Sequence, residues 1–165
     1  MLEEAGITAP ASLTFVTVNF TRDDLRDVLV GAGFDTSAET QWVWEGVCYY
    51  LSGIAVDQTL ASIRACSPAG SVVCFDYLVD APDMKTRYGV AESEAAMRET
   101  YRNEPVQFGI KEGTIESFLA ERGYSLVEHL NTEEQERRFL RLRDGTPAGR
   151  ALACFGFVSA RVERS

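Results

Sequence analysis

The stretch from Gln41 to Leu51, which reads QWVWEGVCYYL, constrains the fold of this chain more than any other segment. Its first four residues are aromatic or β-branched for the most part, which favours a strand. Glu45 and Gly46 break that run, and Ser52 then stands where the N-cap of an amphipathic helix is expected. Ligands of open α/β sheets bind at the carboxyl ends of strands. Glu45 is therefore a candidate for binding a cationic or hydroxyl-rich small molecule, and a solvated turn residue is an equally good interpretation.

The order of the predicted elements indicates an α/β fold. Segments with strand character alternate with helical segments along the chain, which predicts a mainly parallel sheet with helices on both faces. A chain of this length is expected to form a single domain, residues 1–165. The last strand follows a short helical insertion, so we expect it to pair antiparallel at the edge of the sheet. The predicted strands are Leu13–Phe20, Gln41–Trp44, Ser71–Val79, Tyr124–Leu130 and Ala151–Val162.

The first helix has a start signal and a stop signal. Thr21 and Asp24 form a capping-box pattern, and Gly31 and Gly33 end the helical period. The sequence GAGFDT that begins at Gly31 also mimics a glycine-rich cofactor loop, but such a loop must follow a strand and open a helix. We interpret it as a helix stop. Further helices are expected from Ser52 to about Ala65, over residues 84–102 with Met84, Tyr88, Ala91, Ala95 and Met97 near one face, over Thr114–Arg122, and from Thr132.

The charge and hydropathy of the chain exclude some partners. A formal net charge of −9 argues against nucleic acid and against an anionic membrane, because both require clustered Lys and Arg. The chain has no apolar run of about 18 residues that could span a bilayer. Its first residues, MLEEAGITAP, lack the apolar centre of a signal peptide. A cytoplasmic location is expected.

The cysteines and the single histidine are interpreted as structural. Cys48, Cys66, Cys74 and Cys154 all lie in apolar surroundings and form no C-x-x-C pair, so we expect four reduced thiols and no metal site. His129 lies in an apolar segment, and the sequence offers too few partners for a metal cluster or a Ser-His-Asp system.

Several segments together resemble the leucine carboxyl methyltransferase family of S-adenosylmethionine-dependent O-methyltransferases. The matching pieces are TFVTVNF with its following helix, AGFD, WEGVCYYL, AGSVVCFDYLV, EPVQFGI and FLAERGY, in the family's order over nearly the whole chain. WEGVCYYL, which begins at Trp44, is the most specific of them. The resemblance implies a Rossmann-like class I methyltransferase fold, and it implies S-adenosylmethionine as the methyl donor.

The resemblance also assigns site residues. It implies that Glu45, followed by Gly46, contacts the methionine part of the cofactor. Asn19 and Phe20 stand where the family usually has an Asp and an apolar residue beside the adenine; Asn19 keeps hydrogen-bonding groups and loses the charge. The residues expected where the substrate approaches are Asp76, Tyr77 and Phe108, for which a strand end and a packed loop are alternative interpretations. No catalytic residue is indicated, although Asp76 could act as a base toward a hydroxyl substrate.

The resemblance further implies that the N-terminal part of such an enzyme is missing before Met1. The family carries an N-terminal portion with a glycine-rich Asp-Thr-Arg loop and an acidic ribose-binding strand end, and AGFD at Ala32–Asp35 already matches a later position. The chain is thus expected to be a truncated C-terminal portion, with cofactor binding weakened or lost. Two functions stay open: an O-methyltransferase acting on a carboxyl or hydroxyl oxygen of a small molecule or peptide end, and a non-catalytic paralogue acting as a binding module.

The absent strands predict a rearranged sheet edge. In the family's order two strands separate Leu13–Val18 from Gln41–Trp44, and unpaired strand edges are poorly tolerated by soluble proteins. Either Leu13–Val18 slides over to pair with Gln41–Trp44, or the open edge pairs with another chain, as a homodimer or with an N-terminal partner chain. We favour the slide, because Thr21–Thr40 is long enough for a right-handed crossover between adjacent parallel strands.

Overall fold

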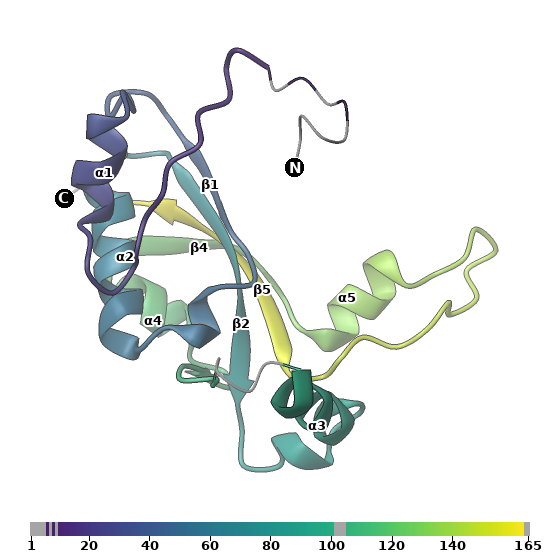
Figure 1. Cartoon of the computed structure of the whole chain (residues 1–165). Coiled ribbons are helices and arrows are strands. Elements are labelled where there is room, and N and C mark those ends of the chain that lie inside the picture. The colour runs from purple at the N-terminus through teal and green to yellow at the C-terminus, as the bar shows by residue number, and fades with distance from the viewer. Residues whose placement is uncertain (1–5, 7, 9, 101–104, 164–165) are drawn as a thin grey trace.

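The computed structural model describes residues 6, 8, 10–100 and 105–163, and within them it has an α/β architecture around one mixed sheet (Figure 1). The strands are β1 (Gln41–Trp44), β2 (Val72–Asp80), β3 (Ile110–Lys111), β4 (Tyr124–Leu130) and β5 (Phe155–Val162). The helices are α1 (Leu25–Gly31), α2 (Gly53–Ala65), α3 (Val90–Thr100), α4 (Ile115–Ala120) and α5 (Thr132–Phe139), with 3-10 turns η1 (Cys48–Tyr50) and η2 (Met84–Thr86).

The order of the strands in the sheet is β1-β2-β5-β4, and β3 pairs with the end of β2. Three helices, α1, α2 and α4, lie together on one side of the sheet (Figure 1).

The unit formed by β1, α2 and β2 follows the prediction closely. β1 and β2 are parallel, with Trp42 opposite Val73 and Trp44 opposite Phe75. Because side chains alternate along a strand, these four residues share the face that α2 covers. The side chain of Ser52 caps α2 by accepting a hydrogen bond from the Ala55 amide at 3.3 Å, which confirms the predicted N-cap. The buried core that results includes Trp44, Val56, Leu60, Ile63, Val73, Phe75, Leu119, Tyr124, Val158 and Ala160.

The last strand is antiparallel, as predicted, but its position in the sheet was predicted wrongly. β5 lies between β2 and β4 and pairs with both, so β4 is the strand at that end of the sheet. Val158, Ala160 and Val162 are all buried on one face. An alternating apolar strand of this kind suits an edge position as well as an interior one, so the sequence of β5 does not decide its neighbours. The antiparallel share of the sheet is correspondingly larger than predicted.

The predicted strand Leu13–Phe20 does not form. These residues have no strand pairing, and Leu13, Phe15 and Val16 are exposed, Phe15 by 73%. The expected slide to Gln41–Trp44 is therefore wrong, because β1 pairs with β2 alone among the described residues. Apolar alternation makes a strand possible, but only a neighbouring strand provides the hydrogen bonds. Pairing of this edge with another chain stays a prediction.

The beginning of α1 was also predicted wrongly, and its end was predicted correctly. The N-cap is Asp24, whose carboxylate accepts a hydrogen bond from the Asp27 amide at 3.1 Å, so Thr21 does not cap the helix. The helix ends at Gly31, and Gly33 takes a φ of 91°, which glycine adopts readily. GAGFDT is thus confirmed as a helix stop.

The segment from residue 84 to residue 111 differs from the single long helix that was predicted over residues 84–102. It contains the short turn η2, the helix α3 and the two-residue strand β3. The predicted apolar face was also incorrect, because Ala91 and Ala95 are exposed whereas Val90 is buried. The predicted positions 101–104 lie outside the described residues. No helix in the described part of the chain is long and apolar enough to cross a membrane.

Candidate functional site

The turn after β1 is held against β2 by Asp76. Glu45 follows the last residue of β1, and Gly46 takes a φ of 71°, a conformation that suits glycine. The Gly46 amide donates a hydrogen bond of 2.8 Å to Asp76 Oδ1. The Cys48 thiol donates a hydrogen bond of 2.8 Å to the main-chain carbonyl oxygen of Asp76. Asp76 is buried, and its carboxylate holds the Gly46 amide while its main-chain carbonyl oxygen holds the Cys48 side chain.

Glu45 itself points to solvent. Its side chain is exposed, and it has no ion-pair or hydrogen-bond partner in the described part of the chain. The structure thus places Glu45 at the carboxyl end of a strand, as predicted, and β1 is an outer strand of the sheet among the described residues. A carboxylate without a partner on a restrained turn can accept hydrogen bonds from a cationic group without first breaking an internal bond.

Asn19 and Phe20 lie in the turn that precedes α1. The Asn19 side-chain oxygen accepts hydrogen bonds from the amide and hydroxyl of Thr21, at 3.0 and 2.7 Å. Asn19 is exposed and Phe20 is half-buried. The amide oxygen of Asn19 is therefore engaged within its own turn, whereas its side-chain nitrogen makes no hydrogen bond to another described residue.

Asp76 and Tyr77 point to opposite faces of the sheet, because they are consecutive residues of one strand. The Tyr77 hydroxyl shares a hydrogen bond of 2.9 Å with His129 Nε2, and the two rings stack with centroids 6.0 Å apart. Burial raises the pKa of Tyr77 to about 12, and burial also lowers the pKa of His129. His129 thus has a structural partner in the core, in line with the sequence interpretation. Asp76 and Tyr77, although adjacent in the sequence, therefore do not contribute to the same binding site.

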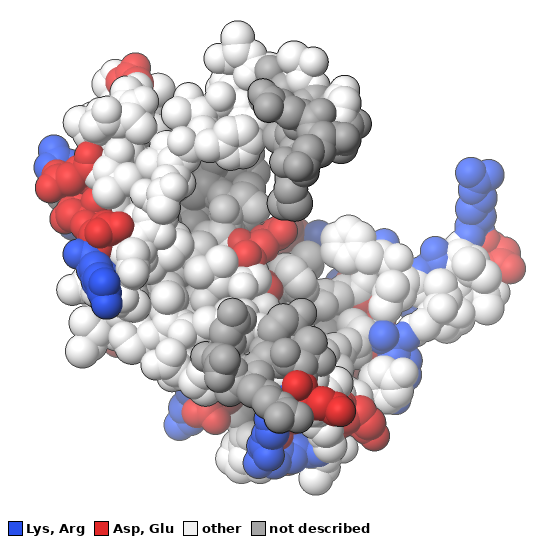
Figure 2. Space-filling view, in the orientation of Figure 1, with Lys and Arg blue, Asp and Glu red and all other residues white. Residues whose placement is uncertain are grey.

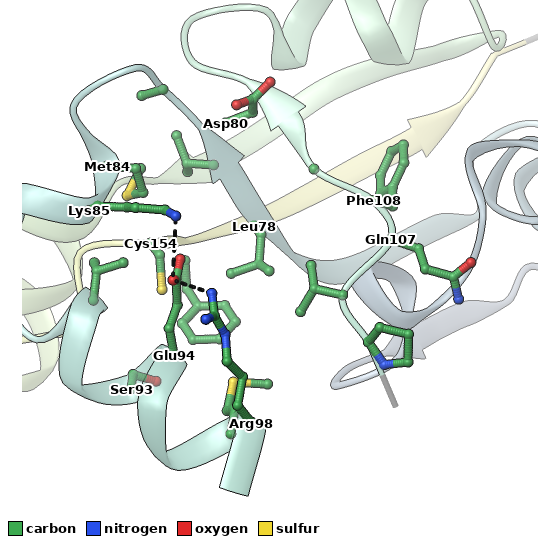
Figure 3. A pocket seen from close by; sticks show the side chains of 18 of the residues that line it. Leu78, Asp80, Met84, Lys85, Ser93, Glu94, Arg98, Gln107, Phe108 and Cys154 are labelled. Atoms are coloured by element: carbon green, nitrogen blue, oxygen red, sulfur yellow. Dashed lines mark hydrogen bonds and ion pairs between the residues drawn. The ribbon is translucent and has the colours of Figure 1, made fainter. Parts of the chain in front are cut away.

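A cavity of about 780 Å³ opens beside the carboxyl end of β2 (Figure 3). Its volume is in the usual range for small-molecule sites. One wall comes from β2 and the loop after it, the second from α3, and the third from residues 105–109 with the start of β5. Of the predicted substrate residues, Phe108 lines this cavity, whereas Asp76 and Tyr77 do not. The apolar part of the lining includes Leu78, Met84, Val90, Met97, Cys154 and Phe155.

The α3 wall is the part of the site that the sequence interpretation missed. Val90, Ser93, Glu94, Met97 and Arg98 all line the cavity. Their spacing of three, four, seven and eight residues from the first places them on one face of a helix. That spacing was visible in the sequence, but the weak apolar period favoured a different face.

Residues 1–64 match the leucine carboxyl methyltransferase family. The resemblance predicted from the sequence is confirmed. A protein of Mycolicibacterium paratuberculosis with the provisional name S-adenosyl-L-methionine-dependent methyltransferase is 38% identical over 85 residues, which are 52% of this chain and 27% of that protein. A protein of Mycolicibacterium vanbaalenii with the same provisional name is 29% identical over 148 residues, which are 90% of this chain and 45% of that protein. The chain thus spans less than half the length of these two methyltransferase relatives.

A solved structure supports the fold. It comes from work on the conversion of a disulfide bond into a thioacetal group during echinomycin biosynthesis. The TM-score is 0.52 at 14% sequence identity, over 98% of this chain and 59% of that chain. At this identity the likeness concerns the fold alone.

Proposed function

We propose that this chain is the C-terminal portion of an S-adenosylmethionine-dependent O-methyltransferase that acts on a carboxyl or hydroxyl oxygen of a small molecule or peptide end. The observation that carries the proposal is the carboxylate of Glu45, which has no partner among the described residues and lies at the carboxyl end of β1, within the segment that matches the methyltransferase family. Ligands of open α/β sheets bind beside the carboxyl ends of the strands. The names of the relatives support the cofactor.

The residues around the β1 turn fit one end of the cofactor. S-adenosylmethionine supplies a methyl group on a sulfonium centre and carries an ammonium group on its methionine part. Glu45 would hold that ammonium group, because its carboxylate has no partner within the described residues. Gly46 leaves the backbone free of a side chain at the same point. Asn19 and Phe20 would contact the adenine, with the Asn19 side-chain nitrogen as donor because its oxygen is already engaged.

The cavity beside β2 would hold the methyl acceptor, with Phe108 in its wall. A carboxylate acceptor needs no general base, so holding the reactants close and aligned would supply most of the rate. Asp76 would act as a positioning residue, because its side chain holds the turn that carries Glu45. Tyr77 would support the site from the core rather than by contact with substrate, since its hydroxyl is bonded to His129.

The partner of this chain would be a polypeptide that pairs along the outer edge of β1. That edge has no strand beside it in the described residues. The chain also covers only 45% of the length of the Mycolicibacterium vanbaalenii relative. A second copy of the chain or an N-terminal polypeptide could each supply the strand. Acidic and basic side chains are interspersed over the described part of the face in Figure 2, which fits a protein or small-molecule partner rather than nucleic acid. A cytoplasmic location remains a prediction.

Calorimetric titration with S-adenosylmethionine tests the proposal. We expect a dissociation constant on the order of micromolar for the chain, alone or with an N-terminal polypeptide of a relative added. Glu45→Gln should remove the measurable heat, because an amide cannot replace the ionic contact with the ammonium group. Glu116→Gln is the matched control, since Glu116 is an exposed carboxylate on α4, and it should bind like the unmodified chain.

The alternative function, a non-catalytic binding module, makes the opposite prediction. No heat at millimolar cofactor, with and without the added polypeptide, would overturn the methyltransferase proposal and leave that alternative. Equal loss of binding in Glu45→Gln and Glu116→Gln would overturn the role of Glu45.

A further inference from the structure

The α3 wall of the cavity carries a small cluster of charges. Lys85 Nζ lies 4.0 Å from Glu94 Oε2, and Arg98 Nη2 lies 3.4 Å from the same oxygen. Two cations therefore share one carboxylate, and the cluster has a net charge of +1 on a chain whose net charge is −9. Figure 3 shows the Lys85 and Arg98 side chains converging on Glu94 at the cavity.

These ion pairs are weak enough to be exchanged. The Lys85 and Arg98 side chains are 75% and 77% exposed, and both distances are longer than a good charge-assisted hydrogen bond. Exposed pairs of this kind contribute little to stability, because water screens the two charges. Either cation can therefore turn to another anion at small cost.

The nearby Arg87 shows the opposite arrangement. It lies between Asp83 and Glu112 with contacts of 2.8 and 2.7 Å, and its side chain is only 28% exposed. Arg87 thus has two carboxylates for one positive charge, and it ties the η2 turn to the segment after β3. Among the described residues that line the cavity, the cations available to a ligand are Lys85 and Arg98.

The surroundings of the cluster define the rest of the ligand. The cavity next to it is lined by Leu78, Met84, Val90, Met97 and Phe155, which bind apolar groups. Glu94 and Cys154 both line this cavity. Asp80 also lines the cavity, but in Figure 3 its carboxylate points away from the cluster.

We propose that the acceptor of this site is an apolar molecule with one anionic group, which Arg98 and Lys85 bind by displacing Glu94 while the apolar body occupies the cavity. The inference rests on the proposed function only in taking this cavity as the acceptor site. Glu94 would act as an internal competitor for the two cations. A neutral molecule of the same shape would gain the apolar contacts alone.

Binding of 2-naphthoate and its neutral analogue 2-naphthamide to the full chain, followed by fluorescence without any cofactor, tests this inference. We expect naphthoate to bind about twofold to fivefold more tightly, as one solvent-exposed ion pair allows. Arg98→Gln should remove most of that preference and leave naphthamide binding unchanged. Glu94→Gln should tighten naphthoate binding, because it removes the competing carboxylate.

Two further variants separate the site from the rest of the surface. Arg143→Gln removes an exposed arginine outside the cavity and should change neither affinity. Ser93→Trp fills the cavity and should abolish binding of both molecules. Equal affinities for the two molecules, weaker naphthoate binding in Glu94→Gln, binding that survives Ser93→Trp, or no binding of either molecule would overturn the inference. Because no methyl donor is present, failure of this experiment is distinct from failure of the proposed function.

Discussion

At the scale of single residues, Gly156 packs directly against the ring of Tyr77 and leaves no room for a side chain. A Cβ atom at this position would lie 2.6 Å from Tyr77 Cζ, and the Tyr77 ring is held by its bond to His129. We predict that Gly156→Ala destabilises the protein by about 1–3 kcal/mol, because the ring cannot move without breaking that bond. Urea unfolding measures the difference in the free energy of unfolding.

Gly149→Ala is the control for this prediction, since a Cβ atom there meets open space. It should change stability by less than about 0.5 kcal/mol. Tyr77→Leu should recover part of the loss in the Gly156→Ala background, because the smaller side chain makes room. A Gly156→Ala protein as stable as Gly149→Ala would contradict the proposed clash.

His129 gives a prediction about pH. Burial lowers its pKa in the folded state, so below the ordinary value the unfolded chain binds more protons than the folded one. Stability should therefore decrease as the pH falls from about 7.5 to about 5. His129→Gln keeps a hydrogen-bonding partner for Tyr77 and should flatten that slope. An unchanged slope in the variant would show that other groups cause the pH dependence.

At the scale of elements, the open edge of β1 determines how the protein associates. Val43 is 65% exposed in this strand, and its face is opposite the one that α2 covers. We predict that Val43→Lys folds with stability within about 0.5 kcal/mol of the unmodified chain, because an exposed edge tolerates a charge. The same variant should reduce any self-association seen by sedimentation velocity.

Val73→Lys is the matched contrast, since Val73 has no exposed surface on the neighbouring strand β2. It should unfold the protein by burying an unpaired charge. If Val43→Lys instead lowers stability as much as Val73→Lys does, the outer face of β1 is covered in solution by another part of the molecule or by a second copy.

Part of these elements and of the site follows from local sequence, and part does not. Ser52 and the stripe of Val56, Leu60 and Ile63 predict α2, because a cap and a helical period act within a few residues. Glu45 at the end of β1 follows from the same kind of signal. The cavity wall on α3 is harder to predict, because its residues are a mixture of polar, apolar and charged types. Packing against the end of β2 decides which face of α3 lines the cavity.

At the scale of the whole molecule, the buried thiols report on global unfolding. Burial, followed by the charge of Asp76, raises the pKa of Cys48 to about 12, and burial also raises the pKa of Cys66 and of Cys154. Because the thiolate is the reactive form, we predict that these three cysteines react with a thiol reagent only as fast as the protein unfolds.

The thiol count completes that measurement. All four cysteines are free in the structure, so denatured protein should show four reactive thiols. Two or none would indicate disulfides in solution. Rapid reaction of Cys48, Cys66 and Cys154 in native buffer would show that the region around β2 opens locally without global unfolding.

The sequence by itself determined the α/β class, the helix α2 with its cap, the β1 turn with Glu45 and the family resemblance, because each depends on residues close together in the chain. Only the tertiary structure decided that β5 lies between β2 and β4, that Leu13–Phe20 finds no strand to pair with, and that Asp76 and Tyr77 serve opposite faces. The physical reason is common to these cases. Strand pairing and cavity walls depend on hydrogen bonds and contacts between distant segments, and an apolar alternation is compatible with several neighbours or with none.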